Sequence, residues 1–363
     1  MEKENATRTS VIMDKNDSFQ RLSSSIACMR FPLAVTIIFY HSYTIVSIPG
    51  SQFYFKFIYP FSLWLGETGV PAFFFISGLW FFYSKKTYQE KIRARIQSLL
   101  IPYFLWNAIM LFAFIIAFLW GYNHIINHVK AIADYGIIDY MRAFWDCGDW
   151  HYGNGKPVYP PMWFVRDLFL LCLLSPVIKV IIKNTHFIFP LAAILFWLFF
   201  PGFWLIPESI MAFYTGAYFP LCNKNPMDFL DKHKKLVIGS MILLGIADVI
   251  TNTVYYIPFN LQIHRLAILA NIFSIPIIGE LFINHHISMK SLSNMAFFIY
   301  CIHLPIVALF RKPVLWYPQL TDGIHIALYF TTVLTVTIIT IFIYKLTKSI
   351  WPSFIRIATG NRD

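Results

Sequence analysis

Long apolar segments, separated by short polar stretches, account for most of this chain. A helix that crosses a bilayer needs roughly 17–25 mainly apolar residues. We expect a transmembrane helix at each of the following segments, of which the sixth is the shortest: 26–48, 61–83, 99–120, 163–182, 187–206, 208–222, 236–255, 264–283, 292–310 and 324–345. The pattern therefore predicts an all-α polytopic membrane protein with about ten transmembrane helices.

The composition supports a membrane environment. Hydrophobic residues make up 58% of the chain and charged residues 13%, whereas soluble domains average roughly 45–50% apolar and about 25% charged residues. A soluble fold with so little charge would be unable to cover its surface, so lipid is the expected solvent for much of the chain. The five cysteines form no CxxC pair, and we expect neither a disulfide framework nor a zinc site.

The distribution of Lys and Arg predicts the orientation. With the N-terminus in the cytoplasm, most of the 29 basic residues fall in cytoplasmic segments, as the positive-inside rule requires. We therefore expect both termini to be cytoplasmic, with tails at 1–24 and 347–363 around one membrane domain at 25–346. The basic excess follows this topology, and no polar region interleaves aromatic with basic residues, so no nucleic-acid partner is expected.

One loop on the predicted outer side, 121–162, is too long for a simple connector. It is rich in Asp, aromatic residues and Gly, a composition that suits either contact with a sugar or a folded cap over the outer mouth, and both readings stay open. Asp146, Asp149 and His151 have the chemistry of metal ligands, but their spacing matches no strong pattern. We predict no metal site.

Ionisable residues inside predicted spans are costly and are therefore functional candidates. Most of them fall in the outer half of the bundle, which suggests a polar cavity that opens outward. Arg166, which follows a Trp-Phe-Val run, also fits a simple interfacial anchor. The candidates are Arg30, His41, Glu67, Arg166, Asp167, Glu208, Asp248, Arg265, Glu280 and His303.

Helix geometry relates the first three candidates. Arg30 and His41 are eleven residues apart, so they share one helix face and are separated along the axis by about 16 Å. Arg30 lies at the cytoplasmic start of the helix and His41 in its outer half. Glu67, on the following span, lies at a similar depth to His41. We expect a Glu67–His41 hydrogen bond that raises the basicity of the imidazole; the alternative is that Glu67 is a polar bridge in helix packing.

A basic cluster precedes the third span. Its lysines, Lys85, Lys86 and Lys91, fit the positive-inside signal alone. Its arginines, Arg93 and Arg95, adjoin the span, and their fixed fork of donors suits phosphate. We therefore expect the two arginines to bind a phosphate-bearing ligand together with Arg30.

Five elements, in order along the chain, resemble those of acyltransferase family 3, the integral-membrane enzymes that O-acylate bacterial surface and secreted carbohydrates. No element is specific alone, but their order and spacing across the predicted spans are fairly specific. The elements are an Arg, ten residues and a His (Arg30 to His41); a Gly-Val-Pro, Phe-rich, Ser-Gly run (69–78); Arg-Ala-Arg (93–95) followed by Pro102-Tyr103; Trp-Phe-Val-Arg (163–166); and Tyr-Cys-Ile-His (300–303).

The resemblance implies a membrane O-acyltransferase that moves an acyl group, acetyl by default, from acyl-CoA to a hydroxyl of a cell-surface or secreted carbohydrate. The family also contains members with longer acyl or succinyl donors, and nothing in the sequence excludes them. The implied catalytic residues are His41, as the base, and Glu67. The implied binding residues are Arg30, Arg93 and Arg95 for the donor, and Trp163, Arg166, Tyr300 and His303 for the acceptor.

The resemblance also implies partners and a location. Acetyl-CoA, or another acyl-CoA, would be a donor substrate rather than a permanently bound cofactor, and the acceptor a carbohydrate or lipid-linked glycan. The surroundings would be the lipid of the bacterial inner membrane. Some members carry a C-terminal hydrolase-like domain; none is visible here, so we expect the acceptor to meet the membrane site directly. Two alternatives stay open: a proton-coupled transporter of a small polar solute, which also fits buried titratable residues, and a non-catalytic scaffold.

Overall fold

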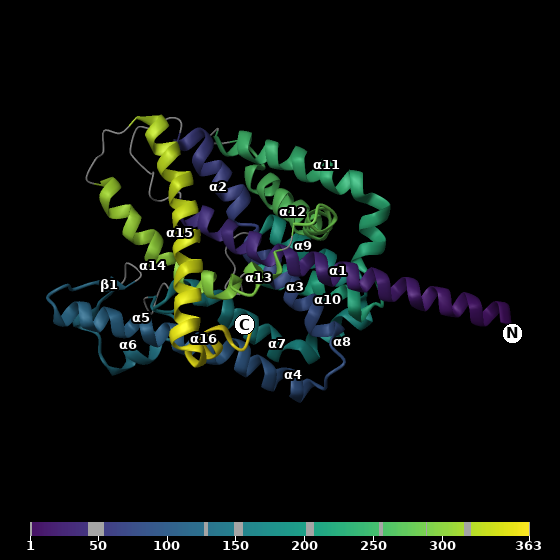
Figure 1. The fold of residues 1–363 in the computed structure, drawn as a ribbon, viewed down its shortest axis with the longest axis horizontal. Helices are drawn as coiled ribbons and strands as arrows, with labels where there is room; N and C mark the ends of the chain where they lie inside the picture. The colour runs from purple at the N-terminus through teal and green to yellow at the C-terminus, as the bar shows by residue number, and fades with distance from the viewer. Residues whose placement is uncertain are drawn as a thin grey trace.

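The computed structural model describes residues 2–42, 54–126, 130–148, 155–200, 207–253, 257–287, 289–315 and 321–362, and these are helical almost throughout (Figure 1). The first half contains α1 (Glu2–Ser42), η2 (Tyr54–Ile58), α2 (Tyr59–Gly66), α3 (Gly69–Tyr83), α4 (Tyr88–Arg95), η3 (Ile96–Leu100), α5 (Ile101–Leu119), β1 (Ile125–Ile126), β2 (Lys130–Ala131), η4 (Ile132–Asp134), α6 (Ile137–Arg142), η5 (Pro160–Met162) and α7 (Trp163–Leu173). The second half contains α8 (Ser175–Thr185), α9 (Ile188–Phe199), α10 (Pro207–Leu221), α11 (Pro226–Thr253), α12 (Asn260–Asn284), α13 (Lys290–Ser293), α14 (Ala296–Leu315), α15 (Asp322–Ile350) and α16 (Pro352–Thr359).

Helix α1 is the central element of the bundle. It packs against α2, α3, α12, α14 and α15, while its N-terminal part projects beyond the other helices (Figure 1). Leu22, Ile26, Leu33 and Ile38 are buried along its length. A helix that is surrounded in this way carries its polar side chains into the interior, and α1 carries both Arg30 and His41.

The helices confirm an all-α polytopic membrane protein. Within the described ranges, six are long and apolar enough to cross a bilayer, and a seventh candidate, α8 with α9, is bent by 109°. The number ten and the cytoplasmic placement of both termini stay predictions. The six are Ser18–Ser42, Lys56–Tyr83, Tyr88–Leu119, Pro226–Asn252, Asn260–Asn284 and Gly323–Ile350.

The remaining predicted spans coincide with shorter helices. The segment 163–182 is divided into α7 and α8 at Leu174, because Pro176 in the first turn of α8 has no N–H to continue the hydrogen-bond ladder of α7. The segments 187–206, 208–222 and 292–310 correspond to α9, α10 and α14. Apolar composition alone therefore located these helices but did not reveal their breaks.

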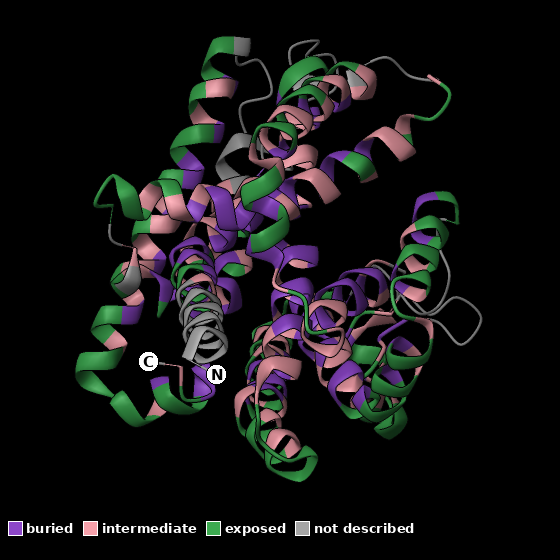
Figure 2. Ribbon diagram, turned by 90° about the vertical axis from the view of Figure 1, so that its right-hand side faces the viewer, coloured by how far each residue is buried: buried purple, intermediate pink, exposed green. Residues whose placement is uncertain are grey.

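Apolar side chains cover the outer faces of the long helices. On α15, every fourth residue from Phe330 to Ile350 is exposed and apolar, namely Phe330, Leu334, Ile338, Phe342, Leu346 and Ile350. Residues four apart share one helix face, so this stripe is suited to contact with lipid tails. Figure 2 shows the buried residues gathered where the helices cross and the exposed ones on the outward faces.

Glycines allow the helices that carry the site to approach closely. A Cβ at Gly78 on α3 would lie 2.2 Å from the carbonyl oxygen of Phe213 on α10, and a Cβ at Gly66 would lie 2.4 Å from the Cβ atom of Tyr40 on α1. Both separations are far below van der Waals contact. The Gly66 contact brings the C-terminal end of α2 against the residue that precedes His41, so no side chain fits at this crossing.

The loop 121–162 is folded, with a small core of its own. Leu111, Ile126, Ile132, Ala143, Cys147 and Val158 form a buried cluster separate from the main core. The two short strands pair antiparallel, with Ile125 opposite Ala131, and the N–H of Val158 donates to the carbonyl oxygen of Ala143 at 2.7 Å. The described part of the loop is thus packed; a cap over the outer mouth and contact with a sugar both stay predictions.

Candidate active site

His41 lies one residue before the end of α1, and its imidazole ring faces that of His303 on α14. The two ring centroids are 5.0 Å apart, and the ring planes are tilted by 41°. His303 is fully buried, whereas His41 is half-buried. The structure therefore brings together two histidines to which we gave separate roles, the base and an acceptor-binding residue.

The neutral form of His303 has one defined tautomer. Its Nδ1 lies 2.6 Å from the carbonyl oxygen of Tyr300, and because a carbonyl oxygen only accepts, Nδ1 carries the hydrogen. Nε2 is then an acceptor, and within the described part of the chain it has no hydrogen-bond partner. An unpartnered buried acceptor is costly. The site therefore offers a lone pair on a ring that contacts His41.

Trp163 and Tyr300 belong to an aromatic layer beside the two histidines. The hydroxyl of Tyr300 donates to the carbonyl oxygen of Pro161, just before α7, and the ring of Tyr300 lies 6.0 Å from that of His303. Trp163 packs against Phe74 of α3 at 6.2 Å. In this structure both side chains hold α7 in place, and Tyr300 also positions His303 through its carbonyl group.

Arg166 ties α7 to the outer loop. Its Nε donates to the carboxylate of Asp167 at 2.8 Å, while Nη1 and Nη2 donate to the carbonyl oxygens of Trp145 (2.6 Å) and Gly155 (2.9 Å). Its guanidinium also lies over the ring of Trp145. These contacts anchor the loop to α7. They engage three of the five N–H groups of Arg166, which we had expected to bind the carbohydrate acceptor.

Glu67 pairs with His264 rather than with His41. The carboxylate of Glu67 lies 2.8 Å from Nε2 of His264, and Asp248 lies 2.8 Å from Nδ1 of the same ring. Asn252 donates to the other oxygen of Asp248 at 2.6 Å. The hydrogen bond that we expected between Glu67 and His41 is thus replaced by a bridge between the end of α2 and the helices α11 and α12.

This bridge is the centre of a larger group that we call the polar cluster, which comprises Glu67, Glu208, Asp248, His264 and Arg265. Arg265 donates to the carbonyl oxygen of Trp197 and interacts electrostatically with Glu208 and Glu67. Asp248 is fully buried and His264 nearly so. We had expected four members to line an outward cavity. His264 was missed, although its position next to Arg265 at the start of a predicted span was a usable signal.

The predicted donor arginines come from two helices. Arg30 lies on α1, eleven residues before His41, and Arg93 and Arg95 lie in the last turn of α4. Arg95 is the last residue of α4, whose start is defined by a capping box between Thr87 and Glu90. Its guanidinium lies 5.8 Å from the ring centroid of Phe81. Arg30 and Arg93 are exposed, and Arg95 is half-buried. Within the described residues no carboxylate forms an ion pair with any of these three arginines.

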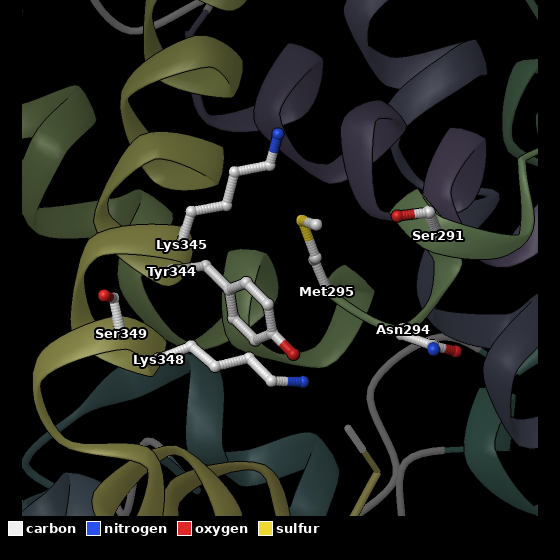
Figure 3. A pocket seen from close by; sticks show the side chains of 7 residues that line it. All are labelled: Ser291, Asn294, Met295, Tyr344, Lys345, Lys348 and Ser349. Carbon is white, nitrogen blue, oxygen red and sulfur yellow. The ribbon is translucent and has the colours of Figure 1, made fainter.

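A cavity of about 370 Å³ opens between the end of α15 and the start of α14 (Figure 3). Lys345 and Lys348 line it from α15, with the ammonium of Lys348 5.7 Å from the ring centroid of Tyr344. Met295 and Asn294, immediately before α14, form the opposite wall. The cavity is therefore positively charged on one side and lies near the basic residues of the predicted cytoplasmic face.

Glu280 is engaged in contacts between helices. It accepts from Arg21 at 2.6 Å and lies 3.7 Å from Lys234, while Arg21 also pairs with Asp231. These ion pairs join the early part of α1 to α11 and α12. Glu280, one of the ionisable candidates, therefore stabilises packing in this structure.

The loop 121–162 contributes one further charge to the site. Lys156 interacts electrostatically with His41. Among the described residues no group of three His, Cys, Asp or Glu side chains is arranged to hold a metal ion. Asp149 and His151 lie outside the described residues. Burial raises the pKa of the Cys147 thiol to about 11.

Known proteins resemble this chain over nearly its full length. The model of the acyltransferase domain family matches residues 23–346. The succinoglycan biosynthesis protein ExoH of Rhizobium meliloti (strain 1021) is 24% identical to this chain over 374 aligned residues, which cover 94% of this chain and 93% of the relative. No solved structure matches significantly.

Proposed function

This chain belongs to acyltransferase family 3, and from that premise we propose that it transfers an acyl group, acetyl by default, from acyl-CoA to a carbohydrate hydroxyl. Family membership makes the protein an enzyme, while donor, acceptor and site belong to the proposal. The observation that carries it is the His41–His303 ring contact, 5.0 Å between centroids, on the helix that also bears Arg30, eleven residues earlier. A base and an anion-binding group are thereby aligned along one helix.

In the proposed reaction His41 accepts the proton of the acceptor hydroxyl. The hydroxyl oxygen attacks the thioester carbonyl carbon, a C–O bond forms, and the C–S bond breaks to release the CoA thiolate. The proton held by His41 then passes to the sulfur, directly or through water, which restores the neutral base. His303 supports this scheme because its Nε2 is a buried acceptor that orients a hydroxyl or an imidazole N–H beside His41.

The donor is proposed to approach from the arginine-bearing end. Arg30 and Arg95 have no described carboxylate partner, and guanidinium groups bind phosphate through paired N–H donors. The axial distance from Arg30 to His41 is about 16 Å along the helix, a span that an extended pantetheine arm can cover. The acceptor is proposed to enter from the opposite end, under the loop 121–162.

A carbohydrate acceptor is supported by the relative, which is named for succinoglycan biosynthesis. The loop supports the same conclusion, because Lys156 interacts electrostatically with His41 and exposed Trp145 and Tyr122 offer apolar ring surface. The alternative of a proton-coupled transporter rests on the polar cluster alone. Two of its carboxylates, those of Glu67 and Asp248, are bonded to His264, and such an arrangement serves helix packing without any proton movement.

The test is transfer of label from radiolabelled acetyl-CoA into carbohydrate, with inverted membrane vesicles that contain the wild-type protein or His41→Ala. Wild-type vesicles should label the carbohydrate fraction, and His41→Ala should lower the rate by about 10²–10⁴-fold, the usual contribution of a general base. His285→Ala is the matched control, since His285 is exposed at the end of α12 and should transfer at the wild-type rate.

The other outcomes are equally informative. A labelled wild type with an equally active His41→Ala protein would retain the acyltransferase and remove His41 as its base. Vesicles without label from acetyl-CoA, but with label from a longer acyl-CoA, would correct the acyl group. Vesicles that accumulate a polar solute with protons and transfer no acyl group would favour the transporter.

A further inference from the structure

The chain after α15 turns back into the bundle. Helix α16 begins with a proline in its first turn and packs against α5 and α15, where the indole N–H of Trp106 donates to the carbonyl oxygen of Ala358 at 3.0 Å. Ile355, Ala358 and Thr359 are fully buried. A segment that we expected to be part of a tail is therefore docked as an integral piece of the structure.

Gly360 allows the last residues to enter the interior. Its φ is +65°, a conformation that glycine adopts without steric cost. A Cβ at this position would lie 2.5 Å from the Cα atom of Ser98, so only glycine fits. The turn delivers Arg362 to the junction of η3 and the start of α14.

Arg362 is held there by two contacts. Its Nη2 donates to the carbonyl oxygen of Ser98 at 2.9 Å, and its guanidinium carbon lies 4.1 Å from the ring centroid of Phe297 on α14. Flat stacking on a ring and one hydrogen bond leave most of the five N–H donors of an arginine available. The side chain is positioned but not saturated.

Arg362 joins the two arginines already assigned to the donor. Burial, followed by the positive charges of Arg95 and Arg30, lowers the pKa of Arg362. Arg362 thus interacts electrostatically with both arginines, and Ser98, to which it donates, lies three residues after Arg95 in the adjoining η3. Among the described residues no carboxylate pairs with any of the three. Mutual repulsion without compensation is relieved by an anion.

A cavity lies close to Arg362. The cavity lined by Lys345 and Lys348 borders Met295, and Phe297, on whose ring Arg362 stacks, is two residues further along the chain. The cavity and Arg362 therefore lie at the same end of α14. Figure 3 shows the two lysines on the α15 side of the cavity.

From these contacts we infer that the docked C-terminal segment is part of the donor site, and that Arg362 binds a phosphate group of the donor together with Arg30 and Arg95. The inference deepens the proposed function, because it rests on a phosphate-bearing acyl-CoA as donor. It adds a recognition residue from a segment beyond the residues that the family model matches.

The experiment measures the affinities of coenzyme A and phosphate-free pantetheine for the full-length protein in lipid nanodiscs. We expect wild type to prefer coenzyme A strongly, and Arg362→Gln to reduce that preference about tenfold because charge-assisted hydrogen bonds are lost. Arg362→Lys should keep part of it through its point charge. Arg356→Gln is the matched control: Arg356 lies exposed on the same segment, and the variant should retain the full preference.

The preference is a ratio taken within one preparation, so a partly unfolded variant lowers both affinities without changing it. An unchanged ratio in Arg362→Gln would overturn the inference, as would a wild type that binds both ligands equally. Transfer from acetyl-CoA, measured on the same samples, separates the two proposals. If Arg362→Gln is active and keeps the wild-type ratio, only the role of Arg362 is refuted. If His41→Ala transfers normally, the catalytic proposal is refuted and the phosphate site is unaffected.

Discussion

The two charged regions of this protein differ in how their charges are compensated. In the polar cluster, His264 lies between Glu67 and Asp248 at 2.8 Å from each, and Arg265 is bound to a backbone carbonyl group. At the arginine end, Arg362 interacts electrostatically with Arg95 and Arg30, and none of the three has a described carboxylate partner. Both regions are built from several helices, and both place charge where it is costly.

The difference indicates separate uses of charge. A buried group whose partners come from the same chain contributes to packing, and its removal is felt as lost stability. A group of like charges without a partner lowers stability by itself and is retained for a ligand that carries the opposite charge. Substitutions in the polar cluster should therefore affect folding, and substitutions at the arginine end should affect substrate binding.

The largest expected effect comes from His264→Leu. The change leaves fully buried Asp248 without its imidazole partner, and breaking a buried pair in this way costs about 3–5 kcal/mol of unfolding free energy. Reversible unfolding in mixed micelles would measure it. The double variant Asp248→Leu/His264→Leu should recover part of the loss. If the single variant is as stable as wild type, the cluster is not structural.

The next largest effect is a difference in donor binding between the two arginines that precede the third predicted span. Arg93 and Arg95 are two residues apart, about 200° around a helix, so they face opposite ways; Arg95 lies over Phe81 and Arg93 is exposed. Arg95→Gln should raise the KM for acyl-CoA about tenfold with unchanged unfolding, and Arg93→Gln should raise it far less. Equal effects would show that both bind the donor, as the sequence alone suggests.

The smallest effect is a pH dependence in the outer loop. Lys130 and then the N–H of Gly136 bond to Asp139 and lower the pKa of its carboxyl group. The stabilising contribution is therefore present above the unfolded carboxyl pKa of about 3.9 and is lost as the pH falls through the folded value. The protection factors of residues 130–139, which correct hydrogen exchange for its intrinsic pH dependence, should fall below about pH 4.

Asp139→Asn is the companion variant for that measurement. At neutral pH its protection should be slightly lower than that of wild type, by less than about 1 kcal/mol, because the Lys130–Asp139 pair is partly exposed to solvent. In strong acid the two proteins should exchange alike. A variant that differs more in acid than at neutral pH would reverse the sign argued here.

Part of the architecture and of the site could be predicted from the sequence. Apolar length predicts the membrane helices, and the helical repeat places Arg30 and His41 on one face of α1. Depth in the membrane predicts which polar residues lie at similar levels but not how each helix is rotated. For this reason Glu67 was expected opposite His41, whereas rotation of α2 and α12 brings it to His264.

Other features had no local signal. Arg362 interacts with Arg30 and Arg95 because α16 turns back and Gly360 packs against Ser98. Hydrophobic periodicity predicts neither feature. The break between α7 and α8 had a signal in Pro176, but a proline inside an apolar run also occurs in continuous spans, as at Pro32 of α1. The choice between a kink and a break is made by the neighbouring helices.

The helices of this bundle also differ greatly in length. α10 has 15 residues and α15 has 29, which correspond to about 22 Å and about 44 Å along their axes, whereas a hydrocarbon core is about 30 Å thick. α10 is not among the helices long enough to cross such a core, whereas α15 exceeds it. A helix of that length favours tilt or local thickening of the lipid, at a modest cost per ångström of mismatch. The acyl-chain length of the host lipids thus enters the energetics of this enzyme.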